Sequence, residues 1–465
     1  MKNLKLKNLQ NQKVGILGLG EENIALAYFL VAQGIDITIC DQKSREELGQ
    51  YYEKMKNLSS QVQFQLGANY LENLEKFNII FRTPGLPYLN SKIQKAKNVG
   101  VIISSEIKLF FDLCPCPVVG VTGTKGKGTT TTLIAEILKW KSEIRNPKSE
   151  IYLGGNIGTS PISFLEKLTS DDIVVLELSS FQLQDMERSP HIAVVLDIKI
   201  DHLDYHQSRT EYIESKINIV KYQTKNDFTV VNADYLTSFE FGAESLSKTY
   251  WFSRRKSVDE GCFVKENQIV LRINNEDIPI CKTDEIILKG EHNLENICAA
   301  VTASKLAGAD SESIKTVVKS FKGLEHRLEF VRNFNEINFY NDSFSTTPDT
   351  TIAAIKSFKT PIILLVGGSE KNADYSELGQ TIKNSTVKNI ISIGQTAPKI
   401  IKAIGENHVI KITDNILSME EAVKLALELG QKNDVVILSP ASASFDRYKN
   451  YKERGEIFKK VVLDL

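Results

Sequence analysis

The sequence lacks the features that are typical of membrane, secreted and nucleic-acid-binding proteins. Its longest apolar runs, such as residues 361–366, are far shorter than the ~20 residues that a membrane-spanning helix needs. The first 13 residues are polar and lysine-rich, and no apolar signal core follows them. The 57 basic and 58 acidic side chains give a formal net charge of −1, so neither sign dominates. We therefore expect a cytoplasmic protein with no membrane or nucleic-acid partner.

Cysteine is also scarce. Six cysteines are scattered through 465 residues, and Cys114 and Cys116 form a C-x-C pair with no second pair nearby. That pattern does not supply the four ligands of a structural zinc site, and disulfides are rare in a reducing compartment. No internal repeat or low-complexity stretch is present. A chain of this length with 42% apolar residues is too long for one core, which indicates two to three domains.

The most informative stretch that is present is PVVGVTGTKGKGTTTTL at residues 117–133. It predicts a strand, a glycine-rich turn and a helix whose N-terminus favours an anion. Lys127, at the start of the helix, can reach a terminal phosphate. Val121 and Gly128 stand where the usual phosphate-loop pattern has Gly and Ser or Thr. We favour a nucleotide phosphate site over the alternative of a glycine turn with solvated lysines.

An apolar run with glycines, KVGILGLG at residues 13–20, opens a second pattern. A predicted helix follows, then a predicted strand at 35–40 with Asp41 at its end, as in a dinucleotide-binding βαβ unit. Asn23 replaces the third fingerprint glycine, which weakens the case for NAD. A site for another nucleotide diphosphate is favoured, and a turn that only packs helix on strand is the alternative. Further strands are expected at 78–83 and 99–104.

A predicted buried strand at residues 172–178 is apolar between its first residue and Glu177 near its end. A carboxylate there is costly unless it is paired or bound to a metal. Beside a phosphate loop the natural partner is Mg²⁺, which takes oxygen ligands and bridges nucleotide phosphates. An edge carboxylate paired with a lysine is the alternative.

His202 and His206 have the spacing of one helical face, which suggests zinc at first sight. No Glu lies inside the pair as in H-E-x-x-H, and a turn is expected here, so one histidine near a metal or phosphate is favoured. A predicted helix at 210–220 carries Lys216, which by itself indicates a solvated lysine. Asn293 and Asn296 share a face of a later predicted helix. Their amides suit a purine edge or a helix cap, and the two interpretations are equally open.

A third α/β pattern closes the chain, with strands expected at 337–340, 361–366, 389–393 and 435–439. Polar segments follow three of these strands, at 341–343, 367–371 and 439–442. Because the carboxyl ends of parallel strands lie along one edge, a site at that edge is more plausible than three separate turns.

In combination, these motifs resemble those of the Mur ligase family, and the resemblance covers nearly the whole chain. The segment LELSSFQL is typical of the D-glutamate branch of that family. The motifs, in chain order, are GVTGTKGKGTT (120–130), GGNIG (154–158), LELSSFQL (176–183), DHLDYH (201–206), Y-x-x-x-K ending at Lys216, GEHNLENICAA (290–300), HRLE (326–329), NDS (341–343), LLVGGSEKNADY (364–375) and LSPASASFDRYKNYKERG (438–455).

The resemblance implies three α/β domains. A Rossmann-like N-terminal domain (1–112) would bind the UDP of the substrate, a central P-loop domain (113–325) would bind ATP, and a Rossmann-like C-terminal domain (326–465) would bind the incoming amino acid. The implied reaction is ATP-dependent addition of D-glutamate to UDP-N-acetylmuramoyl-L-alanine through an acyl phosphate, in peptidoglycan precursor synthesis. We expect a monomer that uses ATP and two Mg²⁺ ions.

The resemblance also implies roles for individual residues. The catalytic group would be Lys127, Glu177, His202 and Lys216, with Glu177, His202, a carbamylated Lys216 and Thr129 as metal ligands. The ATP contacts would be Gly123, Thr124, Lys125, Gly126, Lys127, Gly128, Thr129, Asn293, Asn296, Arg327 and Asp342. The contacts to the UDP substrate would be Gly18, Leu19, Gly20, Glu21, Asp41, Asn156 and Ser179. The amino-acid contacts would be Thr346, Lys371, Ser444 and Tyr451.

Four positions depart from the family pattern. Gly128 lacks the hydroxyl that would ligate Mg²⁺, for which Thr129 or water could substitute. Lys125 adds a charge where Asn is usual, and Phe344 removes one where Lys is frequent. Asn23 replaces a glycine. Two alternatives therefore stay open: a related Mur or folylpolyglutamate-type ligase with another amino acid, and a nucleotide-binding paralogue with impaired catalysis.

Overall fold

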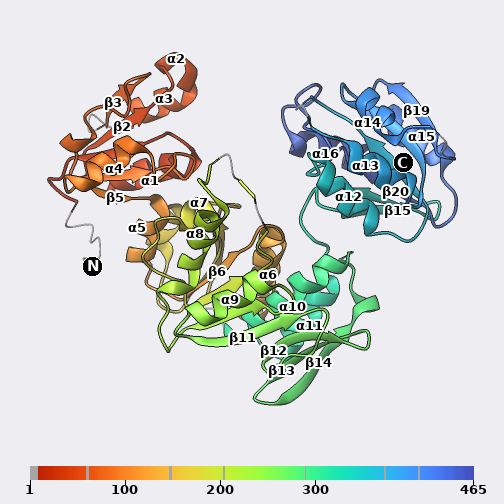
Figure 1. Cartoon of the computed structure of the whole chain (residues 1–465), viewed down its shortest axis with the longest axis horizontal. Helices are drawn as coiled ribbons and strands as arrows, with labels where there is room; N and C mark the ends of the chain where they lie inside the picture. Colours follow the sequence, from red (N-terminus) through yellow and green to blue (C-terminus); the bar gives the residue numbers. More distant parts are fainter. Residues whose placement is uncertain are drawn as a thin grey trace. The chain divides into compact units, whose positions relative to one another are not determined.

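The computed structural model describes residues 9–58, 62–145, 149–199, 201–202, 205–288, 290–370, 373–406 and 409–465. The chain divides into two compact units, which we describe separately: Met1–Thr283 with Glu295–Val318, and Asp284–Leu294 with Lys319–Leu465. Figure 1 shows the three sheets, in red, in yellow to green, and in blue. The fold class predicted from the sequence, three α/β domains, is confirmed by these sheets; the domain bounds themselves stay a prediction.

The first sheet is parallel and has the strand order β3, β2, β1, β4, β5. Its order reverses at β1 and β4, and ligands of open α/β sheets bind at the carboxyl ends of such strands. The strands are β1 (Val14–Leu17), β2 (Ile37–Asp41), β3 (Val62–Leu66), β4 (Ile79–Arg82) and β5 (Ile102–Ser104). The helices are α1 (Glu21–Ala32), α2 (Arg45–Leu48), α3 (Gln50–Lys56), α4 (Ser91–Asn98) and α5 (Glu106–Leu113).

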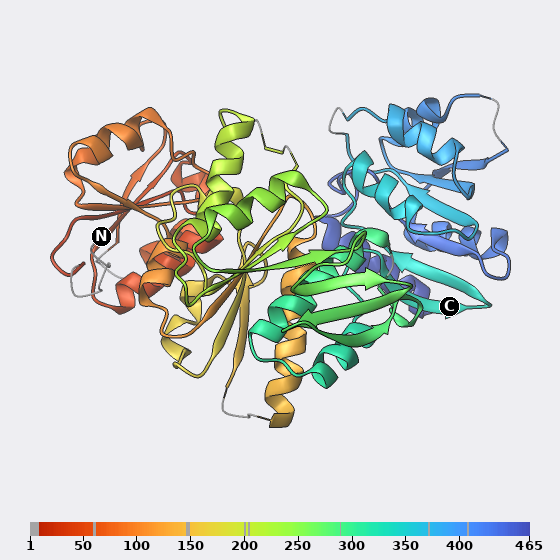
Figure 2. The same cartoon turned by 60° about the horizontal axis from the view of Figure 1, so that its bottom comes forward.

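The central sheet has the order β14, β13, β12, β11, β10, β9, β6, β8, β7. Strands β6 to β12 all pair in parallel, and β12, β13 and β14 form an antiparallel meander. The strands are β6 (Val118–Thr122), β7 (Ile151–Gly155), β8 (Ile173–Glu177), β9 (Ile192–Val195), β10 (Phe228–Asn232), β11 (Lys248–Ser253), β12 (Gly261–Lys265), β13 (Gln268–Ile273) and β14 (Glu276–Lys282). Figure 2 shows them side by side.

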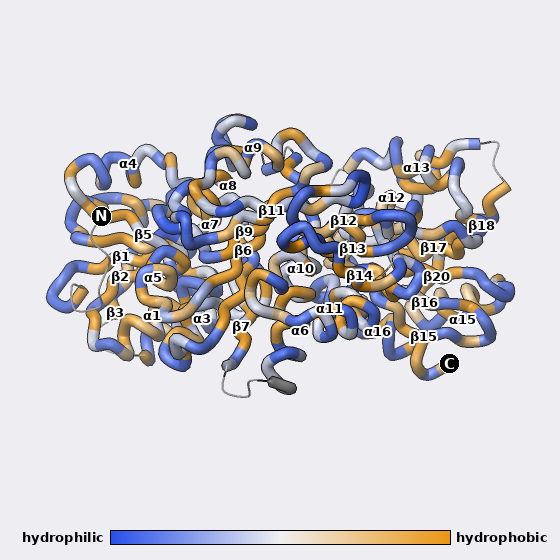
Figure 3. The backbone as a smooth tube through the Cα atoms, turned by 90° about the horizontal axis from the view of Figure 1, so that it is seen from below, coloured by the Kyte–Doolittle hydropathy of each residue, from blue (hydrophilic) through white to orange (hydrophobic). Residues whose placement is uncertain are grey.

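The helices of this region are α6 (Lys127–Arg145), α7 (Ser180–Leu183), α8 (Arg209–Lys221), α9 (Leu236–Glu244), α10 (Glu291–Leu306) and α11 (Ser311–Ser320). Every residue of β6 is buried, which explains why its sequence is apolar up to Val121, before Thr122 and the phosphate-loop glycines. Figure 3 shows β6 and β9 as hydrophobic tube inside a more polar periphery. No helix in the described part of the chain has the length and apolar character that a bilayer crossing requires.

The third sheet lies in the second unit and has the order β15, β16, β20, β17, β18, β19, of which β15 alone pairs antiparallel. Alternate residues of β17 bury into different clusters, Ile362 and Leu364 on one face and Ile363 and Leu365 on the other, so both faces are covered. The strands are β15 (Glu329–Phe334), β16 (Ile337–Asn341), β17 (Ile362–Val366), β18 (Val387–Ile393), β19 (Lys411–Ile416) and β20 (Val435–Leu438). The helices are α12 (Pro348–Lys356), α13 (Ser376–Lys383), α14 (Ala397–Ile404), α15 (Met419–Leu429) and α16 (Tyr451–Leu463).

Candidate active site

The glycine loop connects β6 to α6, as the sequence predicted. Lys127 is the first residue of α6, and its ammonium donates to the carbonyl oxygens of Gly123 at 3.1 Å and Thr124 at 3.0 Å. Lys127 is thus held by the loop itself, and the loop and the lysine would bind a phosphate together. Gly126 has φ +85°, and a Cβ there would lie 2.2 Å from Oδ1 of Asn296 on α10. The loop therefore needs glycine at this position for both conformation and space.

The threonines after Lys127 are turned into the protein. Thr130 donates to Asn296 Oδ1 at 3.4 Å, and Thr131 donates to the carbonyl oxygen of Lys127 at 2.7 Å. Thr129 is 8% exposed, whereas Lys125 is exposed to solvent. Thr129 is the nearest hydroxyl in sequence to the lysine, since residue 128 is glycine.

Lys216 on α8 is buried, and the interpretation of it as a solvated lysine was wrong. Its ammonium donates to Thr122 Oγ1 at 3.2 Å and to the carbonyl oxygen of Gly123 at 3.1 Å. Burial lowers its pKa well below the usual value, and the charge of Lys127 acts in the same direction, while Asp201 and Glu177 oppose it. Helix periodicity alone could not reveal this burial, because α8 packs its lysine against the end of β6.

Glu177 is the last residue of β8 and is 4% exposed. Its Oε1 accepts a hydrogen bond from Asn156 Nδ2 at 2.8 Å, and its carbonyl oxygen accepts one from the Asn156 amide at 2.9 Å. Ser179 follows as the N-cap of α7, where it forms a capping box with Gln182. Of the two predicted substrate contacts, Asn156 is therefore bonded to the buried carboxylate, and Ser179 follows that carboxylate by two residues in the chain.

His202 and His206 have different surroundings. His202 has φ +54° and a side chain that is 48% exposed. His206 is buried, with Nδ1 at 2.8 Å from Glu211 Oε2 and Nε2 at 2.9 Å from Ser180 Oγ, so both ring nitrogens already have partners. Both rings lie near Phe181, with centroids 4.9 and 5.6 Å away.

In the first sheet, the loop after β1 is held by two side chains. Asp41 Oδ2 accepts from the Leu19 amide at 2.7 Å. Asn23 Nδ2 donates to the carbonyl oxygens of Leu17 and Gly18 at 3.1 and 2.8 Å. Asn23, which stands in place of the fingerprint glycine, thus stabilises the loop through its side-chain hydrogen bonds. At the end of this loop, Gly20 is the N-cap of α1 and Glu21 is the first residue of the helix.

Arg82 is a buried charged residue that was not predicted from the sequence. It ends β4, is 1% exposed, and its guanidinium donates to Asp185 Oδ1 at 2.9 Å and to Tyr205 Oη at 3.1 Å. It also donates to the carbonyl oxygen of Phe181 at 3.2 Å. A charge at the end of the apolar run Ile79–Arg82 was the available signal, of the same kind that identified Glu177.

The second unit gathers several predicted residues at the end of β16. Asp342 is buried, its Oδ1 accepts from the Leu328 amide at 3.1 Å, and its Oδ2 accepts from Ser439 Oγ at 2.7 Å. Burial raises the pKa of Asp342 to about 6. Arg327 lies over the ring of Phe344, with its guanidinium carbon 3.7 Å from the ring centroid.

The predicted amino-acid contacts lie around the same loops. Thr346 donates its amide to the carbonyl oxygen of Phe344 at 2.8 Å, and Ser444 is buried. Tyr451 opens α16, and its ring centroid is 5.0 Å from that of Phe344. Lys371 lies outside the described residues.

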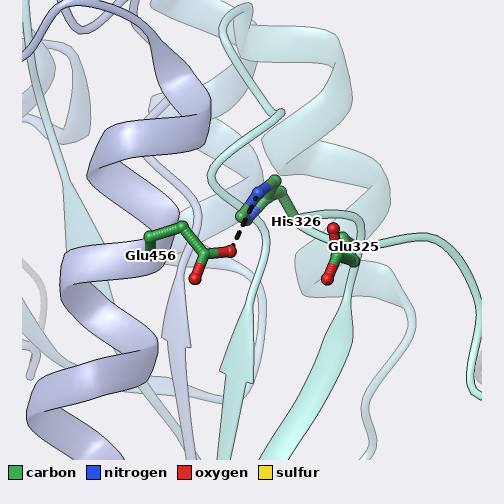
Figure 4. Close-up of side chains that lie close together, drawn as sticks. All are labelled: Glu325, His326 and Glu456. Carbon is green, nitrogen blue, oxygen red and sulfur yellow. Dashed lines mark ion pairs between the residues drawn. The ribbon is translucent and has the colours of Figure 1, made fainter. Parts of the chain in front are cut away.

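One group of acidic and histidine side chains among the described residues has the spacing of metal ligands: Glu325, His326 and Glu456. Figure 4 shows His326 facing Glu456, whose Oε1 lies 3.5 Å from His326 Nε2. The ammonium of Lys459 lies 3.4 Å from the Glu325 carboxylate and 3.2 Å from that of Glu456. The ammonium of Lys459 thus already supplies a positive charge beside these two carboxylates.

Both ring nitrogens of His326 also have partners within the protein. Asn341 Nδ2 donates to His326 Nδ1 at 2.9 Å, which places the ring proton of the neutral tautomer on Nε2, toward Glu456. Burial lowers the pKa of His326. A Cβ at residue 455, which is glycine, would lie 2.2 Å from Nδ1, so the ring is tightly enclosed. The group is an ion-pair network that holds the turn carrying Arg327.

Comparison with known proteins shows the family of the chain. The chain matches the Mur ligase MurD-like N-terminal domain over residues 12–105, the Mur ligase middle domain over 121–304, and the Mur ligase glutamate ligase domain over 326–442. It is 42% identical over 463 residues to the UDP-N-acetylmuramoylalanine–D-glutamate ligase of Acetivibrio thermocellus, covering 98% of this chain and 97% of that protein.

A second relative, the ligase of the same name from Symbiobacterium thermophilum, is 43% identical over 453 residues, covering 97% of this chain and 98% of that protein. Among solved structures, the MurF ligase of Thermotoga maritima in complex with ADP has the same fold, with a TM-score of 0.56 at 18% identity over 99% of this chain and 97% of that one. The family resemblance drawn from the motifs is confirmed: the chain belongs to the Mur ligase family.

Proposed function

We propose that this chain is an ATP-dependent ligase that joins D-glutamate to UDP-N-acetylmuramoyl-L-alanine in peptidoglycan precursor synthesis. Its similarity to D-glutamate ligases extends over nearly their whole length at about 40% identity, which supports the activity and the substrates. The observation that carries the chemistry is the grouping of Lys127, Glu177 and Lys216 at one edge of the central sheet.

The proposed reaction has two steps. The L-alanine carboxylate of the UDP substrate attacks the γ-phosphate of ATP, which releases ADP and leaves an acyl phosphate. The amine of D-glutamate then attacks the acyl carbon, and the tetrahedral intermediate collapses with loss of phosphate and formation of the amide bond. The first step brings a carboxylate against a polyphosphate, so the enzyme must offset a strong repulsion.

Lys127 and the amides of its loop would offset much of that repulsion. The ammonium of Lys127 is held on the inner side of the loop by Gly123 and Thr124, close to where a terminal phosphate would sit. A phosphate oxygen would replace the carbonyl oxygens as its partner. Asn296, which lies against Gly126 and Thr130, would present its amide to the nucleotide from α10.

The donor set fits Mg²⁺, since Glu177 is a buried carboxylate beside the phosphate loop. Glu177 would hold one ion, with Thr129 as a further oxygen donor in place of the hydroxyl that Gly128 lacks. His202 and a carbamylated Lys216 would hold a second. Bound Mg²⁺ would neutralise developing charge on the phosphate oxygens.

The surroundings of Lys216 support carbamylation. A carbamate forms when an uncharged amine attacks carbon dioxide and releases a proton. The Lys216 amine is buried, and both burial and Lys127 favour its neutral form. The added carboxylate would place an anion, instead of a neutral amine, beside the ammonium of Lys127.

The amino acid would bind in the second unit, near Thr346, Lys371, Ser444 and Tyr451. Phe344 stands where a lysine is frequent in the family, and Arg327 stacks on its ring. We therefore propose that Arg327 supplies positive charge in that region. A different amino-acid specificity is the second candidate, because Phe344 alters the charge there.

A phosphate-release assay tests the proposal. It would use the full chain, ATP, Mg²⁺, UDP-N-acetylmuramoyl-L-alanine and a panel of D- and L-amino acids. We expect release that depends on both the UDP substrate and D-glutamate, and mass spectrometry should show the amide product. Turnover with another amino acid alone would favour the second candidate, and ATP binding without turnover on any acceptor would reject the ligase proposal.

A further inference from the structure

The six cysteines fall into two classes. Cys40, Cys262, Cys281 and Cys298 are buried in the protein core, where thiols are inert. Cys114 and Cys116 are partly exposed, and their sulfur atoms lie 3.7 Å apart. The accessible thiols of this chain are therefore adjacent to each other.

The backbone holds this pair together. Cys114 is the C-cap of α5, the last helix before the central sheet, and β6 begins at Val118. Pro115 lies between the two cysteines and Pro117 follows them, and both are exposed. Because proline restricts φ, the backbone between and after the two cysteines has few conformations.

We propose that Cys114 and Cys116 are a reversible thiol-modification site, at which a low-molecular-weight disulfide such as oxidised glutathione converts them to a disulfide. The sulfur atoms would have to approach from 3.7 Å to about 2.05 Å, a movement within the reach of side-chain rotation. The site lies in the segment that joins the first sheet to the central sheet.

The exchange has two balanced steps. The Cys114 thiolate attacks one sulfur of the oxidant, which forms a mixed disulfide and releases one thiol. The Cys116 thiolate then attacks the Cys114 sulfur and releases the second thiol, so two protein thiols are oxidised and one disulfide is reduced to two thiols. A hydrogen bond from Cys116 lowers the pKa of Cys114 and makes it the attacking thiol.

The role of such a bond would be local. A disulfide stabilises the folded state mainly by closing a loop in the unfolded chain, and here the loop contains one residue between the cysteines. It would add little global stability and would be open to reduction. We therefore expect a switchable modification of the linking segment rather than a structural staple.

Alkylation of the native, fully reduced protein followed by mass spectrometry tests the site. We expect the peptide carrying Cys114 and Cys116 to be labelled and the four buried cysteines to be spared. After treatment with oxidised glutathione, that peptide should resist labelling and have lost two hydrogens, and dithiothreitol should reverse the change. A stable glutathione adduct on the unaltered chain would overturn the proposal, as would oxidation of a different pair.

Two variants separate the roles of the thiols. Cys116→Ser should retain a glutathione adduct on Cys114, because no second thiol can displace it. Cys114→Ser should react much more slowly with the oxidant. Cys262→Ser, which removes a buried thiol, is the matched control and should oxidise at the 114–116 pair as the unaltered chain does. Intramolecular oxidation of Cys116→Ser with another cysteine would also count against the assignment.

Discussion

The amine of Lys216 donates a hydrogen bond to the carbonyl oxygen of Gly123 at 3.1 Å, although the two residues are 93 positions apart. The contact joins α8 to the start of the phosphate loop. It places a buried amine within the electrostatic range of Lys127, Glu177 and Asp201. Lys216, the lysine that would be modified, is therefore in direct contact with the loop that would bind the nucleotide.

Lys216→Ala should lower the rate of amide formation by about 100-fold or more, because it removes both the buried amine and any carbamate formed on it. Formate or acetate should restore part of the rate if a carboxylate is what the site requires. The measurement is kcat with and without added carboxylate. Lys221→Ala, an exposed residue of the same helix, is the control and should retain its activity. Full activity of Lys216→Ala would contradict the proposal.

Gly128→Ser should remain active and should need less Mg²⁺ than the unaltered chain. The new hydroxyl would stand directly after Lys127, where the phosphate-loop pattern places an Mg²⁺ ligand. A Mg²⁺ titration of phosphate release measures the effect. Gly128→Ala makes the same backbone change without a hydroxyl and should not lower the requirement. A serine variant that needs more metal than the alanine variant would show the idea to be wrong.

Gly126→Ala should weaken ATP binding by at least about 10-fold and lower the free energy of unfolding by about 1–3 kcal/mol. The residue has φ +85°, and the added methyl group would collide with Asn296 Oδ1 at 2.2 Å. The measurements are ATP binding by calorimetry and urea unfolding. Gly34→Ala is the control, since Gly34 has φ +74° but no atom within 4 Å of an added Cβ. It should carry the backbone strain alone and leave ATP binding unchanged.

Glu106 should make the stability of the first unit depend on pH. The residue is buried, with Oε1 accepting from Ser160 Oγ and from the Ile162 amide. Burial raises its pKa from 4.5 to about 8, and the charge of Glu22 adds to this effect. The folded state therefore retains a proton that the unfolded chain loses. The resulting stability is fully present below pH 4.5 and is lost as the pH rises to about 8.

Glu106→Gln removes this titration. Its free energy of unfolding should change less between pH 5 and pH 9, and at pH 9 it should exceed that of the unaltered chain by about 2–4 kcal/mol. Urea unfolding at the two pH values is the measurement. Glu53→Gln, at an exposed position on α3, is the control and should follow the unaltered chain. The same pH dependence in Glu106→Gln and the unaltered chain would contradict this account.

Arg82→Ala should lower the free energy of unfolding by about 3–5 kcal/mol, because it leaves the buried Asp185 carboxylate without its main partner. The two side chains are 1% and 3% exposed and lie 2.9 Å apart. Lys92→Ala breaks the exposed pair with Glu72 and should cost less than about 1 kcal/mol. Equal losses in the two variants, measured by urea unfolding, would show that burial of the Arg82 pair does not matter.

The strands that the sequence revealed best are those with continuous apolar runs, such as β6, β8 and β17. Seven strands of the described chain were not predicted, among them β3, β15 and β19. Each of these three has a more exposed or mixed composition, as in the alternating VQFQL of β3. Such strands lie at or near a sheet edge, where one side is solvated and the sequence resembles that of a loop.

The sequence by itself determined the family, the glycine loop with Lys127 and the carboxylate at the end of β8, because each depends on local order along the chain. Only the tertiary structure decided which charges are buried. The helix pattern predicted a solvated Lys216 and no pattern predicted a role for Arg82, yet both are enclosed by segments about 100 residues away. Burial depends on which distant surfaces meet, and a local pattern does not contain that information.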